Sequence, residues 1–205
     1  MSVSTSAPPI LESGDRLTRD EFHRRYTDRP DIKKAELVEG VVYVASPVGI
    51  DFHSEPHALV IGWLITYKGK HPGLRVGDNG TVRLDLNNEV QPDAFLWRQE
   101  SGDPHVGADH FLYGAPQLVV EVAASSASYD LHDKKEAYRR AGVREYVIWR
   151  VIDGAIDWFR LRDGEYHLVQ PDARGLIESE AFPGLRLDVP KLLASDVAGV
   201  LAAVG

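Results

Sequence analysis

Two apolar, strand-like segments of this sequence each carry one carboxylate in their interior. Asp93 lies in residues 91–97 (QPDAFLW), and Glu121 lies in residues 118–123 (LVVEVA). A charged group inside an apolar strand costs stability unless something pairs with it. Two such acids, in segments close enough in the chain to become neighbouring strands, predict a shared site for a hard cation.

The alternation of side chains along a strand indicates which faces the acids occupy. Asp93 shares a face with Phe95, and Glu121 shares a face with Val119 and Ala123. Neighbouring strands would let both carboxylates converge on one ion. Mg²⁺ usually takes only one or two carboxylates, with water and substrate phosphate as the other ligands. Such an ion activates water and neutralises charge on phosphate, so the pattern predicts phosphodiester cleavage with Mg²⁺ or Mn²⁺ as cofactor.

A lysine that follows these segments completes the expected chemistry. Residues 130–141 predict a helix whose N-terminus Asp130 can cap. Lys134, near the first turn, has a stem long enough to bring its ammonium back to the acids, where Ala123 offers no functional group. The alternative is that Lys134 pairs with Glu136 or Asp130 on the helix surface.

Composition limits the other classes of function. The chain has 205 residues, 43% of them hydrophobic, which suffices for a full hydrophobic core. The absence of cysteine excludes disulfides, thiolate metal sites and cysteine nucleophiles. No segment is typical of a membrane span or signal peptide, so we expect a cytoplasmic protein with no membrane partner. The net charge of −8 argues against a protein that coats nucleic acid, although basic residues gather in 68–75 and 134–144. The alternative for these clusters is a solvated surface.

The order of predicted elements favours an α/β fold. We expect a disordered leader over residues 1–14 and a single domain over residues 15–205. The expected helices are 18–26 (capped by Thr18), 53–68, 130–141 and 191–204. The expected strands are a hairpin over 35–44 that turns near 39–40, then 74–76, 81–86, 90–97 and 117–123, and finally a meander of 145–152, 155–161 and 166–169. A long polar loop over 98–116 separates two of the strands.

Several short motifs, in order and spacing, resemble the PD-(D/E)XK nuclease superfamily and more specifically the Uma-type family of restriction endonucleases. The motifs are Glu36–Gly40 (ELVEG), Ser46-Pro47 followed by His53 or His57, Pro92-Asp93, Val120–Ser125 (VEVAAS), and Asp130, Lys134, Tyr138, Gly142, Val143, Glu145 and Tyr146 at the spacing D-x₃-K-x₃-Y-x₃-GV-x-EY. The resemblance spans about residues 18–190.

The resemblance implies a restriction-endonuclease-like core, with a mixed central β-sheet flanked by helices and a C-terminal β-meander. It implies that Asp93 and Glu121 are catalytic metal ligands, and that Glu36 is a third acid near the metal or its waters. Ala123 stands where the superfamily normally has lysine. The family is thought to have moved that lysine to the helix, here Lys134.

The histidines and two of the acids have other interpretations. Asp93 can be a turn residue at a strand end, and Glu36 can be exposed on a half-solvated hairpin. His53 and His57 lie one helical turn apart, a spacing that can bind zinc or assist phosphate binding, although a pair without a third ligand is weak support for zinc. We keep His53 as a candidate site residue and expect His57 to cap a helix or face solvent.

Three functions follow. The first is a metal-dependent endonuclease that hydrolyses DNA, expected as a homodimer because cutting both strands commonly takes two sites. The second is a catalytically inactive nucleic-acid-binding or regulatory protein on the same fold. The third is a self-associating protein that uses exposed strand edges of the meander.

Overall fold

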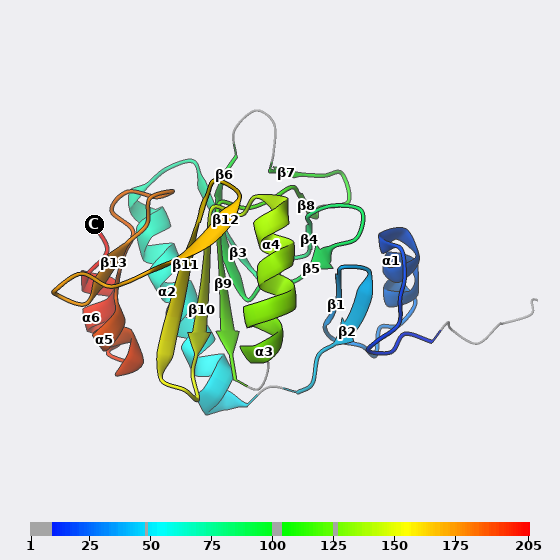
Figure 1. The fold of residues 1–205 in the computed structure, drawn as a ribbon, viewed down its shortest axis with the longest axis horizontal. Helices are drawn as coiled ribbons and strands as arrows, with labels where there is room; N and C mark the ends of the chain where they lie inside the picture. Colours follow the sequence, from blue (N-terminus) through cyan, green and yellow to red (C-terminus); the bar gives the residue numbers. More distant parts are fainter. Residues whose placement is uncertain (1–9, 48, 100–103, 125–126) are drawn as a thin grey trace, which may run out of the picture.

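Two six-stranded sheets, one two-stranded sheet and the helices around them make up the structure, a computed structural model that describes residues 10–47, 49–99, 104–124 and 127–205 (Figure 1). The helical elements are α1 (Arg19–Thr27), the π-helical η1 (Ile50–Ser54), α2 (Glu55–Lys70), α3 (Ala127–Tyr129), the π-helical η2 (Asp130–Lys134), α4 (Lys135–Ala141), α5 (Val189–Leu193) and α6 (Val197–Ala202). The strands are β1 (Ala35–Val38), β2 (Val41–Val44), β3 (Leu74–Asp78), β4 (Val82–Arg83), β5 (Glu89–Val90), β6 (Ala94–Arg98), β7 (His105–Val106), β8 (Leu112–Tyr113), β9 (Leu118–Ala123), β10 (Glu145–Arg150), β11 (Ala155–Arg162), β12 (Glu165–Val169), β13 (Leu176–Glu178) and β14 (Arg186–Asp188).

The central sheet has the order β12-β11-β10-β9-β6-β3. Strands β9 and β10 pair in parallel and the other described pairs of this sheet are antiparallel, so the sheet is mixed, as predicted. The meander forms one half of this sheet. Strand β6 pairs antiparallel with β9, which confirms that the Asp93 and Glu121 segments are neighbours.

The second sheet has the order β2-β1-β5-β4-β8-β7 and was not expected. The prediction of one strand over residues 90–97 is wrong: β5 pairs with β1 and β4 in this sheet, whereas β6 belongs to the central sheet. The chain changes sheets at residues 91–93, where Pro92 has no N–H to donate to a ladder. The predicted loop over 98–116 also contains β7 and β8, although residues 100–103 lie outside the described part.

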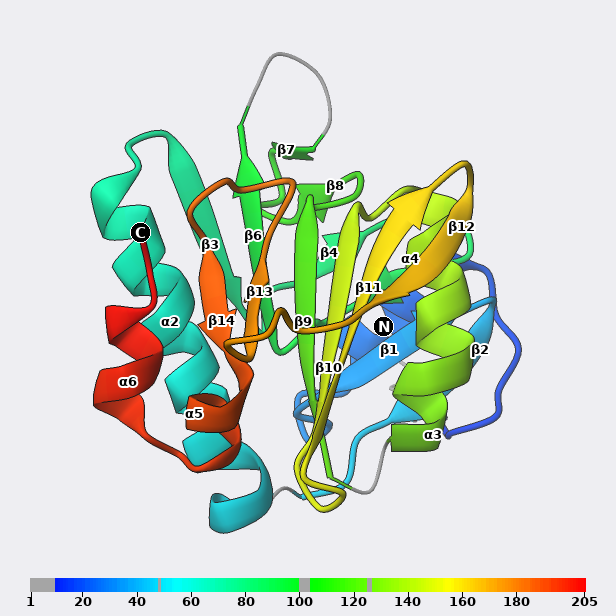
Figure 2. The ribbon, with the colours of Figure 1, turned by 60° about the vertical axis from the view of Figure 1, so that its left-hand side comes forward.

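Alternate residues of the central strands pack into two hydrophobic cores on opposite faces of the sheet. On one face, Trp63 and Leu64 of α2 pack with Leu96 and Val120. On the other face, Tyr138 of α4 packs with Phe95, Val119 and Ala123, and residues of the second sheet join the same cluster. Figure 2 shows α2, α5 and α6 on one side of the central sheet and α4 on the other.

Helix boundaries follow the expected signals in part. Thr18 caps α1 through its side chain, as predicted. Asp130 is not an N-cap, because the helical segment already begins at Ala127, and Asp130 is buried inside it. The predicted C-terminal helix over 191–204 is two short helices, since Ser195 adopts φ 53° between them and Asp196 caps the second.

The β13–β14 hairpin was also not predicted. Residues 1–9 of the expected leader lie outside the described part. Its described end packs on the protein, because Leu11 is buried with Phe22 and Leu37.

Candidate active site

Asp93 and Glu121 bind the backbone of each other's strand on the α4 side of the central sheet. The N–H of Asp93 donates to Oε2 of Glu121 at 3.3 Å, and the N–H of Val122 donates to Oδ2 of Asp93 at 2.9 Å. Both side chains are buried, with 5% and 3% of their surface exposed. Asp93 is therefore more than a turn residue at a strand end, because its carboxylate lies beside Glu121 as the strand faces predict.

Lys134 reaches the Asp93–Glu121 pair from the helical segment that follows β9. Its Nζ lies 2.6 Å from Oε1 of Glu121, 3.1 Å from Oε1 of Glu36 and 3.8 Å from Oδ1 of Asp130. Surface pairing with Glu136 is not observed, since Glu136 pairs with Arg139 and Lys134 is buried. Burial alone would lower the pKa of Lys134, but the surrounding acids raise it well above its ordinary value. Lys134 is thus a buried, charged ammonium.

Lys134 lies at the end of η2, and His53 lies within η1, so each of the two π-helical segments carries one predicted site residue. Short π-helical segments frequently occur at functional sites. The wider turn changes the direction in which the following side chains project from the helix.

Glu36 reaches the same cluster from β1. Its Oε1 accepts the N–H of Gln91 at 2.7 Å in addition to the Lys134 contact, and its side chain is 8% exposed. The interpretation of Glu36 as an exposed hairpin residue is therefore wrong. The hairpin of the second sheet instead places this acid against the break between β5 and β6.

The carboxylate of Asp93 has two further side-chain partners. Lys34 Nζ lies 3.0 Å from Oδ1, and His53 Nε2 lies 3.3 Å from Oδ2. Burial opposes ionisation of Asp93, yet the hydrogen bond from His53 and the charges of Lys34 and Lys134 hold its pKa below the ordinary range. Lys34 was missed at the sequence level. A signal was present, because a residue two positions before Glu36 on an extended segment shares its face.

His57 does not face solvent, contrary to expectation. Its Nε2 contacts the backbone oxygen of Asp93 at 2.8 Å and lies 3.2 Å from Oδ1 of Asp78. The rings of His53 and His57 are 5.8 Å apart. The two histidines therefore support Asp93 from one side.

Tyr138 contributes more than packing. Its hydroxyl donates to Oε1 of Glu121 at 2.9 Å, so this oxygen has both Tyr138 and Lys134 as partners. The pKa of Glu121 is raised to about 8, chiefly by burial, against the lowering effect of Lys134. Nearby Asp93 adds to the increase. Glu121 consequently keeps a proton to a higher pH than an ordinary carboxylate does.

The donor set fits a hard divalent cation that keeps much of its water. Asp93 and Glu121 supply carboxylate oxygens, the ligands that Mg²⁺ and Mn²⁺ prefer. Within the described residues, no group of three or more histidine, cysteine and acidic side chains is arranged to hold an ion. The site therefore fits an ion bound by two carboxylates, with water and phosphate as its other ligands. It does not fit a four-coordinate structural zinc site.

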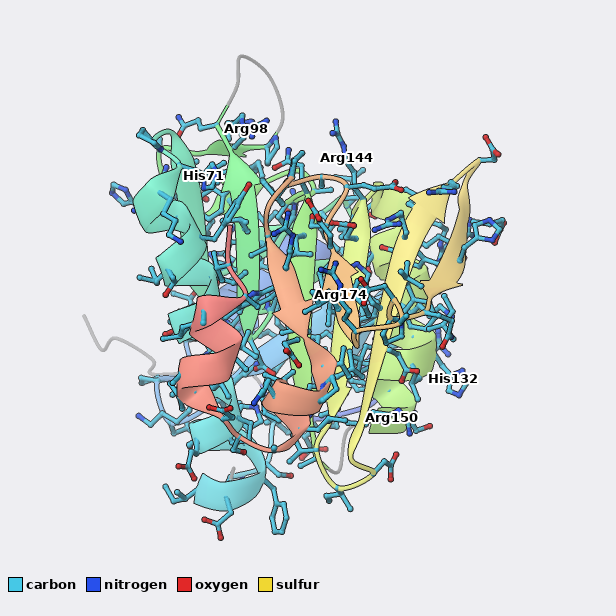
Figure 3. The ribbon with its side chains drawn as sticks, turned by 90° about the vertical axis from the view of Figure 1, so that its left-hand side faces the viewer. His71, Arg98, His132, Arg144, Arg150 and Arg174 are labelled. Carbon is cyan, nitrogen blue, oxygen red and sulfur yellow. The ribbon has the colours of Figure 1, made fainter. Side chains whose placement is uncertain are left out.

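Among the described residues of α4, the cations pair with acids or lie over an aromatic ring. On α4, Arg139 pairs with Glu136 and Glu165, and Arg140 pairs with Glu39. Lys135 lies over the ring of Phe159. Arg144 and Arg150 lie at opposite ends of the central sheet (Figure 3). Paired and dispersed cations agree better with the solvated-surface alternative.

Comparison with known proteins decides the family. A model of the Uma2 family, described as "Putative restriction endonuclease", matches residues 19–190. The chain belongs to the Uma2 family. The earlier resemblance is confirmed, and the motifs that carried it all fall within the matched range.

The fold has a counterpart among solved structures. A crystal structure from Anabaena variabilis ATCC 29413, described as that of "a putative nuclease belonging to DUF820", is similar to this Uma2 protein with a TM-score of 0.60 at 15% identity. The match covers 78% of this chain and 89% of that chain. At this identity the likeness shows the fold alone, and it confirms the α/β prediction. No protein with a curated description matches the sequence. Over the described residues, no helix has the length and apolar character needed to cross a membrane.

Proposed function

We propose that this Uma2 protein is a divalent-metal-dependent nuclease that hydrolyses phosphodiester bonds in DNA. The observation that carries the proposal is the position of the Lys134 ammonium, 2.6 Å from Glu121 on the strand that neighbours Asp93. Two strand acids and one lysine are the groups that metal-assisted phosphodiester cleavage needs. Their burial in one cluster, in a member of a family described as restriction endonucleases, supports that chemistry.

In this proposal Asp93 and Glu121 hold Mg²⁺ or Mn²⁺, which supplies charge neutralisation at the phosphate and an acidified water when bound. Lys134 keeps a positive charge beside the position of the attacking water. Lys34 and His53 orient Asp93, and Glu36 orients Lys134 and accepts a hydrogen bond from water. The oxygen of water bonds to phosphorus and releases a proton to solvent, the bond from phosphorus to one nucleoside oxygen breaks, and that leaving oxygen takes up a proton from solvent.

The test compares isosteric variants in two measurements. Wild type should bind Mn²⁺ in a calorimetric titration and convert supercoiled plasmid to the nicked form in Mg²⁺ or Mn²⁺. Asp93→Asn and Glu121→Gln should lose both, because an amide oxygen is a weaker ligand and carries no charge. A wild type that neither binds the ion nor nicks plasmid would refute the proposal.

Glu145 offers a matched control for the strand acids. It is buried on β10 but pairs with Arg160 and Ser179, away from the site. Glu145→Gln should lower stability while leaving Mn²⁺ affinity and nicking per folded molecule unchanged. Equal loss of activity in Glu145→Gln and Glu121→Gln would point to unfolding instead of chemistry.

A specific observation favours the inactive nucleic-acid-binding protein as a second candidate. Asp93, Glu121 and Glu36 are all paired with lysines in this structure, so the acids are neutralised without an ion. If this candidate is right, wild type shifts the fluorescence anisotropy of a DNA duplex but never cuts it. Asp93→Asn then keeps that affinity, and added salt weakens it steeply.

We further propose a homodimer in the cytoplasm, with one site for each DNA strand. Sedimentation at micromolar concentration tests the dimer. The described edge strands of the central sheet, β3 and β12, are the places where two copies of the sheet can pair.

A further inference from the structure

The buried hydroxyl of Tyr129 lies beside the site and takes no part in the proposed chemistry. The Oη of Tyr129, at the end of α3, is buried and has no hydrogen-bond partner within the described part of the chain. A buried polar atom without a partner is costly, and native proteins usually satisfy it with protein or with ordered water. The orphaned hydroxyl therefore indicates a ligand that is not a protein group.

The surroundings of Tyr129 indicate which ligand that is. The ammonium of Lys134 lies 5.7 Å from the ring centroid. The rings of Tyr43 and Tyr129 pack against each other in a tilted arrangement with centroids 4.1 Å apart, and Tyr43 is the cross-strand partner of Glu36. Tyr129 is thus fixed against the hairpin that carries Glu36 and beside the lysine that Glu36 contacts.

Glu36 has acceptor capacity for a shared ligand. The N–H of Gln91 and the ammonium of Lys134 both approach its Oε1, and the second carboxylate oxygen, Oε2, can accept from a further donor. A tyrosine hydroxyl is protonated at neutral pH and donates one hydrogen bond. A water molecule can accept from Tyr129 and donate to Glu36 at the same time.

We infer that Tyr129 is a positioning residue that donates a hydrogen bond to a metal-bound water held against Glu36. The inference rests on the proposed function, because it assigns Tyr129 to the water shell of the same divalent ion. It adds a residue outside the Asp-x₃-Lys-x₃-Tyr spacing that the family pattern uses. The outer partner of a metal ligand typically changes metal affinity or activity by about 10- to 100-fold when it is removed.

The test compares Tyr129→Phe with Tyr166→Phe, both of which remove only a hydroxyl. The hydroxyl of Tyr166 donates to the backbone oxygen of Val143 at 2.9 Å, away from the acids. Calorimetric titration of Mn²⁺ should show about 10-fold weaker binding to Tyr129→Phe, with plasmid nicking reduced to a similar degree. Tyr166→Phe should bind and nick within twofold of wild type.

Thermal unfolding without metal gives an independent readout. Tyr129→Phe loses no protein hydrogen bond and should melt at or above the wild-type temperature. Tyr166→Phe loses one and should melt about 2–4 °C lower. Mn²⁺ affinity within twofold of wild type in Tyr129→Phe would overturn the inference, as would a melting temperature lowered as far as that of Tyr166→Phe.

The outcomes separate this inference from the proposed function. A wild type that binds Mn²⁺ but cuts no DNA refutes the nuclease, while the Mn²⁺ affinities still decide the role of Tyr129. A wild type that binds no Mn²⁺ refutes both. Binding and nicking by wild type, with no change in Tyr129→Phe, refutes only the role of Tyr129.

Discussion

The ammonium of Lys134 lies 2.6 Å from the carboxylate of Glu121, although the two residues come from a helix and from the middle of a strand. Each side chain is only 3% exposed. Taking two charges out of water is costly, and their attraction repays the cost only with good geometry and further hydrogen bonds. Here Tyr138 and Glu36 provide those further contacts. The pair is therefore better explained by the chemistry of the site than by stability.

The first prediction concerns the charge of Lys134. Lys134→Met keeps an apolar stem but leaves Glu121 and Glu36 without their cation, and we expect a loss of about 3–5 kcal/mol in the free energy of unfolding. Urea denaturation in metal-free buffer measures it. The control is Lys135→Met, which removes only a contact of the neighbouring ammonium with the ring of Phe159 and should cost under about 1 kcal/mol. Equal losses in the two variants would contradict a buried ion pair at Lys134.

The second prediction compares two buried tyrosines that differ in their acceptors. Tyr138 donates to the carboxylate of Glu121, whereas Tyr146 donates to the backbone oxygen of Asp130 at 3.0 Å. A hydrogen bond to a charged group contributes about 1.5–3 kcal/mol, against about 0.5–1.5 kcal/mol for a neutral one. Above about pH 8, where Glu121 is ionised, Tyr138→Phe should therefore lower the urea midpoint more than Tyr146→Phe. The reverse order would show that Glu121 is not a charged acceptor in the resting protein.

The third prediction concerns the glycine that faces Phe95. Gly77 of β3 is the cross-strand partner of Phe95, and a methyl group added at Gly77 would overlap the phenyl ring. Gly77→Ala should cost about 1–3 kcal/mol, because the Phe95 ring must leave its stacked position against Trp97. The control is Gly69→Ala near the end of α2, where a methyl group meets no atom and should stabilise by about 0.5–1 kcal/mol. Thermal unfolding distinguishes the destabilisation expected for Gly77→Ala from the stabilisation expected for Gly69→Ala. Stabilisation by Gly77→Ala would contradict the close approach of Gly77 to Phe95.

The fourth prediction is a pH dependence on the surface of α1. Hydrogen bonds from Arg24 and Arg25 lower the pKa of Glu21 from 4.5 to about 2. Because the folded-state pKa is lowered, the stabilisation from Glu21 is present above about pH 4.5 and is lost as the pH falls through about 2. Titration of the Glu21 carboxyl carbon by NMR measures this pKa.

Two arginine variants check the cause of that pKa. Arg24→Ala should raise the pKa of Glu21, because it removes the larger of the two contributions. Arg19→Ala should leave it unchanged, since Arg19 pairs with Asp20. A wild-type Glu21 that titrates near 4.5 would show that these arginines do not hold the carboxylate.

The sequence by itself predicted most strands of the central sheet, the main helices and the two strand acids as candidates. Apolar runs interrupted by one carboxylate identified Asp93 and Glu121, because an acid in a strand needs a partner. Alternation along the strands placed both acids on one face, and β6 and β9 are indeed neighbours. The hairpin turn near 39–40 is confirmed, with Gly40 at φ 72°, since such turns depend on local backbone preferences.

Only the tertiary structure decided how Lys34, Glu36 and Lys134 meet the two strand acids. The change of sheet at Pro92, the burial of Lys134 and the approach of Lys34 to Asp93 all depend on the second sheet. That sheet is built from strands of two to four residues, which are too short to show a periodic pattern. Its pairings join residues far apart in the chain, as in the contact of Glu36 with Gln91. Such contacts become visible only when the chain is folded, because local sequence carries no information about which distant segment supplies the partner.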